Sequence, residues 1–231
     1  MEKFGNLEKK IKITFKDKAL LKQAFVHRSY INENGSSQLS HNERLEFLGD
    51  AVLELSVTDF LYKKYPEHTE GELTALRSAL VNAVLISAVS EELGMNDYLL
   101  LSKGEAKDHG KARQYILANT YEALIGAIYL DQGYNAADQF IFRTLLPKTE
   151  EIVDKKLWRD AKSLVQEKAQ EFVSATPQYK VLSESGPDHD KHFTVGIYFN
   201  GGLVAQGKGK SKQEAEQAAA QSALQIKNWL D

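Results

Sequence analysis

The sequence predicts two domains, an all-α domain followed by a small α+β module whose elements run in the order α-β-β-β-α. Apolar residues recur at helical spacing through residues 1–150, without strand-like alternation. Three short apolar segments with Gly-containing turns then lie between two further helical patterns. With 231 residues, the chain can form one large domain or two ordinary ones. We expect one domain over residues 1–150, a linker over 151–158 and a second domain over 159–231. The charged segment EEIVDKKLWRD at this boundary is typical of a linker or of the tail of a helix.

The composition limits the class of protein. Hydrophobic residues make up 42% of the chain, but no apolar run approaches the length of a membrane span. The N-terminal stretch MEKFGNLEKKIKITF lacks the basic start and apolar core of a secretory signal, so we expect a cytoplasmic protein with no membrane partner. The chain has no cysteine, which excludes disulfides and thiolate metal sites. A net charge of −3 argues only weakly against a polyanionic partner, because charge distribution matters more than the total.

Capping signals divide the first domain into helices. Asp17 is expected to cap a helix that ends near Phe25, and Asn42 to cap a second one that ends near Tyr65. Thr69 and Glu72 resemble a capping box, which predicts one long helix that Gly94 ends. The remaining expectations are a polar loop over residues 102–114, an apolar helix over 115–130 closed by Gly133, and a helix capped by Asn135.

The second domain has clear element boundaries. We expect a helix over residues 161–173, three strands over 179–182, 192–199 and 203–207, and a last helix capped by Ser211 that runs to about Trp229. Asn200-Gly201-Gly202 is a hairpin signal between the last two strands.

Polar and basic side chains in this second domain indicate an RNA-binding surface. Lys208, Lys210 and Lys212 surround the start of the last helix, where free N–H groups and the helix dipole favour phosphate. His189 lies on a turn between strands, and Gln166 and Glu167 on the first helix can meet ribose hydroxyls. An ordinary solvated helix start is the alternative for an isolated lysine cluster. Three separate signals in this order favour RNA.

This layout resembles the double-stranded RNA-binding domain over nearly its whole length. The family reads two successive minor grooves of A-form duplex and the phosphates of the major groove between them. Gln213 stands where the family usually has a second basic residue. Acids and bases are equal in number from Arg159 onward, so binding must come from local clustering.

Carboxylates of the first domain fall at helical spacing. Glu43, Glu46 and Asp50 follow i, i+3, i+7 and share one helix stripe. On a second helix, Glu122 lies among apolar residues with Asn119 one turn before it. A buried acid needs a partner, and a hard cation with oxygen ligands is one solution. On spacing alone, a solvated helix face explains the stripe better. Glu70 is a further acid, at the start of the intervening helix.

Longer segments decide between these interpretations. HNERLEFLGDAVLEL resembles the signature of the ribonuclease III endonuclease domain, ILANTYEALIGAIYLDQG its second acidic motif, and YPEHTEGELTALRSALV its connecting helix. The resemblance covers nearly the whole chain, because the compact bacterial type is this all-α endonuclease domain followed by one double-stranded RNA-binding domain. It implies metal-dependent hydrolysis of double-stranded RNA to 5′-phosphate and 3′-hydroxyl ends, with roles in rRNA and mRNA processing.

The resemblance also implies site residues, a cofactor and a partner. Its metal-binding carboxylates match Glu46, Asp50 and Glu122, of which Asp50 and Glu122 are the expected catalytic pair; Glu43 and Glu70 match supporting acids. Asn119 stands where the family has an aspartate, and it can offer Mg²⁺ only a neutral carbonyl oxygen. Mn²⁺ is a possible substitute for Mg²⁺. The implied assembly is a homodimer, for which Phe47 and Leu48 are either interface or core residues. The alternative function is a catalytically weak duplex-RNA-binding dimer, which only Asn119 favours.

Overall fold

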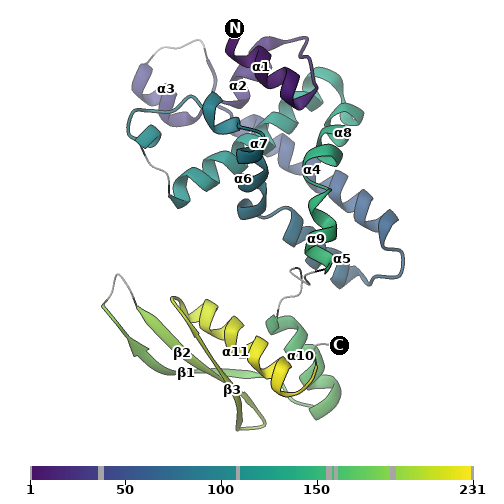
Figure 1. Cartoon of the computed structure of the whole chain (residues 1–231), viewed down its shortest axis with the longest axis vertical. Coiled ribbons are helices and arrows are strands. Elements are labelled where there is room, and N and C mark those ends of the chain that lie inside the picture. Colours follow the sequence, from purple (N-terminus) through teal and green to yellow (C-terminus); the bar gives the residue numbers. More distant parts are fainter. Residues whose placement is uncertain are drawn as a thin grey trace. The chain divides into compact units, whose positions relative to one another are not determined.

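The computed structural model of the chain forms two compact units, residues 1–158 and 159–231 (Figure 1). It describes residues 2–35, 39–107, 110–154, 158, 161–187 and 191–229. Of the predicted linker, residues 151–154 are the end of helix α9 (Lys148–Asp154), and residues 155–157 lie outside the described ones. Each unit has its own hydrophobic core.

The described part of the first unit is built from helices joined by loops, with one isolated bridge between Val26 and Leu100. Besides α9 and two short 3-10 turns, its helices are α1 (Glu2–Ile11), α2 (Lys18–Ala24), α3 (Arg28–Asn34), α4 (Glu43–Lys64), α5 (Glu70–Leu80), α6 (Ala83–Glu92), α7 (Lys111–Gln132) and α8 (Tyr134–Thr144). The sequence patterns do not predict α1 and α3. For the segment that ends α9, they leave a linker and a helix tail as alternatives, and the structure has the helix. The loop expected over residues 102–114 is helical from Lys111 onward, because α7 begins a full turn earlier than its apolar pattern.

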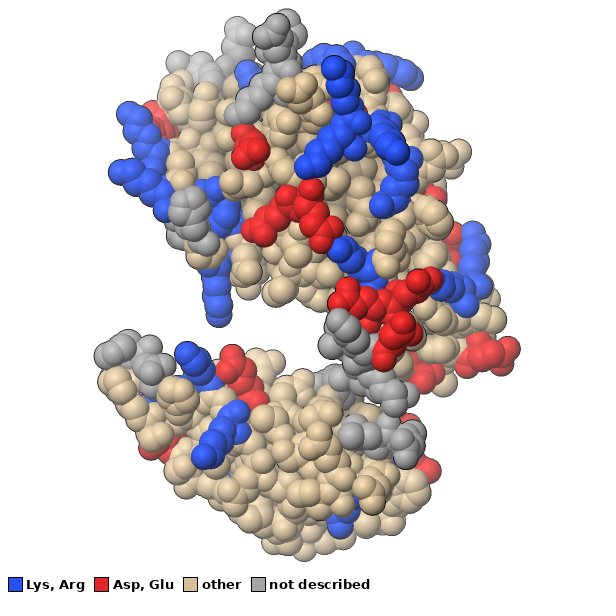
Figure 2. Space-filling view, in the orientation of Figure 1, with Lys and Arg blue, Asp and Glu red and all other residues tan. Residues whose placement is uncertain are grey.

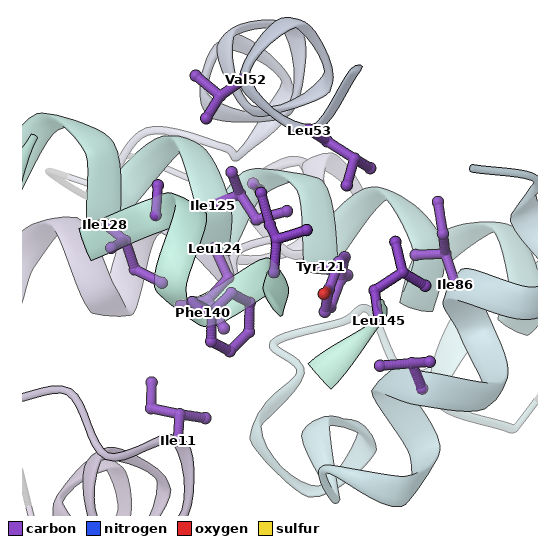
Figure 3. Close-up of a cluster of buried hydrophobic side chains, with 14 of the residues drawn as sticks. Ile11, Val52, Leu53, Ile86, Tyr121, Leu124, Ile125, Ile128, Phe140 and Leu145 are labelled. Carbon is purple, nitrogen blue, oxygen red and sulfur yellow. The ribbon is translucent and has the colours of Figure 1, made fainter. Parts of the chain in front are cut away.

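Helix α7 is the centre of the first unit. Helices α2, α4, α6 and α8 all pack on it, which explains why its sequence is apolar nearly all round. Tyr121, Leu124, Ile125 and Ile128 of α7 meet side chains from several neighbouring helices in this core (Figure 3). Each fully buried Leu or Ile contributes about 1.5–3 kcal/mol, so this packing holds α7 firmly in place.

The prediction of a single long helix after Thr69 is wrong. Helices α5 and α6 are separated at Asn82 and bent by 45° relative to each other. The Asn82 side chain accepts a hydrogen bond from the N–H of Leu85 at 3.0 Å, so a local cap starts the second helix. The capping box itself is confirmed, since Thr69 and Glu72 exchange side chain to backbone hydrogen bonds.

Two other predicted caps are also wrong, although Asp17 does cap α2. Asn42 occupies the N-cap position of α4, but its buried side chain donates to the carbonyl oxygen of Ala24 at 3.1 Å instead of capping the helix. Asn135 lies inside α8, whose N-cap is Gly133. Gly133 has a φ of 84°, a left-handed value that lets one residue end α7 and begin α8.

The second unit has the predicted order of elements. Its helices are α10 (Ala161–Val173) and α11 (Lys212–Ile226), and its strands are β1 (Gln178–Ser185), β2 (His192–Phe199) and β3 (Gly202–Gly209). The strands form an antiparallel sheet in the order β1-β2-β3. Ser211 caps α11 as predicted, and α11 ends at Ile226, three residues before Trp229, which stacks on Phe199.

Helix α11 packs closely on the sheet. A Cβ atom on Gly207 of β3 would overlap the backbone of α11 at Ala215 and Ala219, so only glycine fits there. Small residues on both sides bring the helix close to the sheet, which fixes the position of the helix start.

Among the described residues, no single helix is long and apolar enough to cross a membrane. Helices α5 and α6 meet the length and hydropathy criteria only when taken together across their bend.

Candidate active site

The candidate active site lies where α4 crosses α7. A Cβ on Gly49 would overlap the carbonyl oxygen of Glu122, and one on Gly126 would overlap the carbonyl oxygen of Leu45. The two helix backbones are therefore in direct contact at this pair of glycines. Glu46 and Asp50 flank Gly49 on α4, and Glu122 lies one turn before Gly126 on α7. The crossing brings together acids that are more than 70 positions apart in sequence.

Glu122 is the most perturbed carboxyl group of this site. It is partly buried among the apolar residues of α7, and this desolvation is the main cause that raises its pKa to about 8. The negative charges of Asp50 and Glu46 raise the pKa further. Such a cluster is electrostatically unfavourable unless protons or a cation compensate it.

Glu46 and Asn119 meet directly. Desolvation and the charges of Glu43 and Asp50 raise the pKa of Glu46, whereas a hydrogen bond from the Asn119 side chain lowers it. Glu46 and Asn119 also line one pocket with Glu43. The structure thus brings together the predicted Glu46, Asp50, Asn119 and Glu122, with Glu43 at the edge.

The two predicted supporting acids differ in their positions. Glu43 is half exposed, 3.7 Å from the Arg28 guanidinium and 3.7 Å from His41 Nδ1. Glu70 lies elsewhere, in a pocket that is lined by Thr58 and Tyr62 of α4. At 1.5 Å per helical residue, this part of α4 is roughly 20 Å from Glu46 along the axis. Within one chain, Glu70 therefore does not join the α4–α7 carboxylates.

The donor set suits a hydrated divalent cation. Among the described residues, no three Asp, Glu or His side chains are close enough to form an all-protein metal cage. Mg²⁺ does not need one, because it retains several waters and uses one or two carboxylates together with substrate phosphates. The mutual repulsion of Glu46, Asp50 and Glu122 is what such a cation would relieve.

Sequence reasoning missed part of the pocket beside Glu46. His27, Arg28 and Tyr115 also line it, from the region of α3 and from the start of α7. The bridge between Val26 and Leu100 and the hydrogen bond from the His27 N–H to the Leu100 carbonyl oxygen hold this region in place. The segment HRSY contains these residues, but nothing in its local pattern indicates that it lies beside an acidic helix.

In the second unit, Gln166 and Glu167 are exposed on α10, where they line a shallow pocket with Ser163 and Gln170. His189 lies outside the described residues. Lys208 is exposed on β3 and Lys212 begins α11, with Lys210 between them.

Acidic side chains accompany the basic ones here. Lys212 Nζ is 3.6 Å from Glu184, and the N–H of Lys210 donates to Glu214 at 2.8 Å. The visible face of this unit in Figure 2 accordingly shows a few Lys and Arg side chains beside acidic ones on a largely uncharged surface. A phosphate at the start of α11 would compete with Glu184 for Lys212.

Comparisons with known proteins assign a family to each of the two units. Residues 17–149 match the family described as Ribonuclease-III-like, and residues 161–227 match the Double-stranded RNA binding motif. The chain belongs to the ribonuclease III family. Its first unit is thus an endoribonuclease domain, and its second is a double-stranded RNA-binding domain.

Relatives named Ribonuclease 3 cover nearly the full length of this ribonuclease III chain. The relative from Pelotomaculum thermopropionicum is 44% identical over 96% of this chain and 92% of its own. The relative from Protochlamydia amoebophila is 48% identical over 94% of this chain and 89% of its own. The solved nuclease domain of ribonuclease III from Campylobacter jejuni is 38% identical with a TM-score of 0.58, covering 64% of this chain and 97% of that one.

Proposed function

We propose that the chain hydrolyses phosphodiester bonds of double-stranded RNA at the α4–α7 carboxylates, with Mg²⁺ as cofactor and with 5′-phosphate and 3′-hydroxyl products. The observation that supports this proposal is the close contact between Gly49 and the backbone of Glu122, together with the effect of the Asp50 and Glu46 charges on the pKa of Glu122. The second unit, with its RNA-binding motif, supplies a reason for the duplex to be held nearby.

The side chains have distinct tasks in this proposal. Glu46, Asp50 and Glu122 supply carboxylate oxygens, of which Glu122 is the least able to stay ionised without a counter-charge. Mg²⁺ held by these oxygens would supply activation of the attacking water and compensation of charge on the leaving 3′ oxygen. The firm packing of α7 fixes Glu122 relative to α4, which keeps the site preorganised.

Asn119 has a positioning task that an aspartate could not perform. Its amide donates a hydrogen bond to the Glu46 carboxylate and thereby favours the ionised form that binds metal. This hydrogen bond weakens the case for a catalytically weak RNA-binding dimer, which rests on the lost charge at residue 119 alone.

A homodimer belongs to the same proposal. Phe47 lies next to Glu46 on α4, and 82% of it is exposed to solvent in a single chain. A second copy of the chain that covers this ring would remove a large apolar surface from water and pair two active sites. One solved Campylobacter jejuni nuclease domain is described as flexible in a region involved in dimer formation. We further propose a cytoplasmic location and precursors of rRNA and mRNA as substrates.

Cleavage of defined nucleic acids tests the proposed function. Labelled double-stranded RNA, single-stranded RNA and double-stranded DNA of one sequence are incubated with the full chain, in Mg²⁺ and in EDTA. We expect cleavage of the RNA duplex only, in Mg²⁺ only, with products that a 5′-phosphate-dependent exonuclease degrades. Binding of duplex RNA without cleavage would support the alternative of a non-catalytic dimer, and cleavage in EDTA would exclude the metal.

A further inference from the structure

We propose that Arg28 binds an RNA backbone phosphate next to the one that is cleaved, and so positions the strand over the carboxylates. This inference rests on the proposed function. It starts from the pocket that contains Glu46 and Asn119, because the strand to be cut must enter there. Arg28 is the only Lys or Arg among the described residues that line this pocket.

The charges of the pocket require such a residue. When the scissile phosphate faces Glu46, the next phosphate along the strand also lies near the pocket. A cation at the carboxylates does not compensate the negative charge of this second phosphate. The acid cluster would repel it. The Arg28 guanidinium offers paired N–H donors that match phosphate oxygens, and it is always charged.

The present partner of Arg28 can be exchanged for phosphate. Its contact with Glu43 is 3.7 Å long, beyond ordinary hydrogen-bond range, and the two side chains are 69% and 48% exposed. Ion pairs of this kind contribute little to stability, so a phosphate can replace Glu43 at small cost.

His27 lines the same pocket next to Arg28. Its Nδ1 lies 2.8 Å from the Ser29 hydroxyl oxygen and accepts a hydrogen bond from the backbone N–H of Ser29 at 3.3 Å, so the ring is held in place beside the pocket. The pocket therefore has an arginine and a histidine side chain beside the Glu46 and Asn119 wall. This arrangement fits an anionic group better than a second cation.

Three variants of the full chain test the role of Arg28. Arg28→Gln removes the charge and the fork, Arg28→Lys keeps the charge, and Arg44→Gln removes an exposed charge from the adjacent helix outside this pocket. In steady-state cleavage of duplex RNA, we expect Arg28→Gln to raise KM about five- to tenfold and to change kcat less than about twofold. Arg28→Lys should recover part of the loss, and Arg44→Gln should behave like the unmodified chain.

Duplex binding without divalent cations provides a readout that does not depend on cleavage. Arg28→Gln should reduce the slope of log affinity against log salt by about 1, as expected for one lost phosphate contact. Equal slopes for Arg28→Gln and the unmodified chain, or an equal effect of Arg44→Gln, would overturn the proposal. If the unmodified chain does not cleave, the proposed function fails, while the binding slopes still decide on Arg28.

A role of Arg28 through Glu43 alone makes a different prediction. Glu43→Gln would then reproduce the KM and the salt slope of Arg28→Gln, and the double variant would be no worse than either one. We expect instead that Glu43→Gln leaves the salt slope unchanged or increases it, because an acid near the phosphate is removed. Identical single and double variants would overturn the phosphate contact.

Discussion

At the scale of single residues, the site depends on how Glu122 is kept ionised. Its pKa of about 8 in the metal-free protein lies above the ordinary value of 4.5, because burial and then the charges of Asp50 and Glu46 oppose ionisation. Protonation of Glu122 therefore stabilises the folded state, that is, it adds to the free energy of unfolding. This contribution is fully present below about pH 4.5 and is lost as the pH rises through about 8.

A pH series of melting temperatures in EDTA tests this linkage. Glu122→Gln cannot ionise, so its melting temperature should increase relative to the unmodified chain as the pH rises from about 5 to about 8.5. Added Mg²⁺ should reduce the difference at the higher pH, because the cation compensates the unmodified site. A difference that stays constant over this pH range would mean that Glu122 has an ordinary pKa.

Asn119→Asp changes the balance of charge in the same cluster. It removes the amide that donates to Glu46 and adds a fourth carboxylate. We expect a several-fold lower Mg²⁺ concentration for half-maximal cleavage, since an added charge near a divalent ion contributes on the order of a kilocalorie at an effective dielectric near 20. The metal-free variant should melt at a lower temperature because of added repulsion. An unchanged or higher Mg²⁺ requirement would remove residue 119 from the metal site.

At the scale of elements, the close approach of α4 and α7 is the feature on which the site depends. Gly49→Ala should destabilise the protein by about 3 kcal/mol or more, because its methyl group overlaps backbone atoms that cannot rotate away. Gly71→Ala on α5 is the matched control. Nothing lies within 4 Å of its Cβ position, so alanine there should stabilise by about 0.5–1 kcal/mol. Denaturant unfolding of both variants measures the contrast, and equal effects would argue against direct backbone contact.

The helices and strands also show which structural features local sequence signals can predict. Local signals were sufficient for the Thr69 capping box, for the Ser211 cap and for strand β2, whose bounds the apolar pattern predicts. Local signals failed where tertiary contacts determine how a side chain or a helix is arranged. Asn42 donates to Ala24 instead of capping its helix, and this depends on a chain segment 18 positions away. The break at Asn82 was hidden because apolar spacing continues through it.

The residues of the candidate site also fall into those that local sequence signals predict and those that only tertiary packing brings there. The acidic segments predict that Glu46, Asp50 and Glu122 lie on two helices, and these helices are α4 and α7, because spacing and motif are local properties. Arg28 and Tyr115 could not be assigned, since only the packing of α3 and α7 brings them to the pocket. The motif alone groups Glu70 with the other acids, whereas within one chain Glu70 lies near the opposite end of α4.

At the scale of the whole molecule, the two units have separate cores and separate tasks. Residues 159–231 expressed alone should bind double-stranded RNA and discriminate against double-stranded DNA, because 2′-hydroxyls and A-form groove widths are read by this kind of domain. Binding should weaken as salt rises, since Lys208, Lys210 and Lys212 would contact phosphates. Mobility-shift titrations with both duplexes at moderate salt measure this, and equal affinities would contradict the assignment.

The central claim is that the carboxylates at the α4–α7 crossing cut the RNA, whereas affinity comes largely from the second unit. Glu122→Ala in the full chain tests it most directly, with duplex cleavage in Mg²⁺ and duplex binding in EDTA measured on the same preparation. Loss of cleavage with nearly unchanged binding is the predicted result, because Glu122 lies in the first unit and, in the proposed function, supplies a metal-binding oxygen. Cleavage at the unmodified rate would remove Glu122 from the active site and contradict the account.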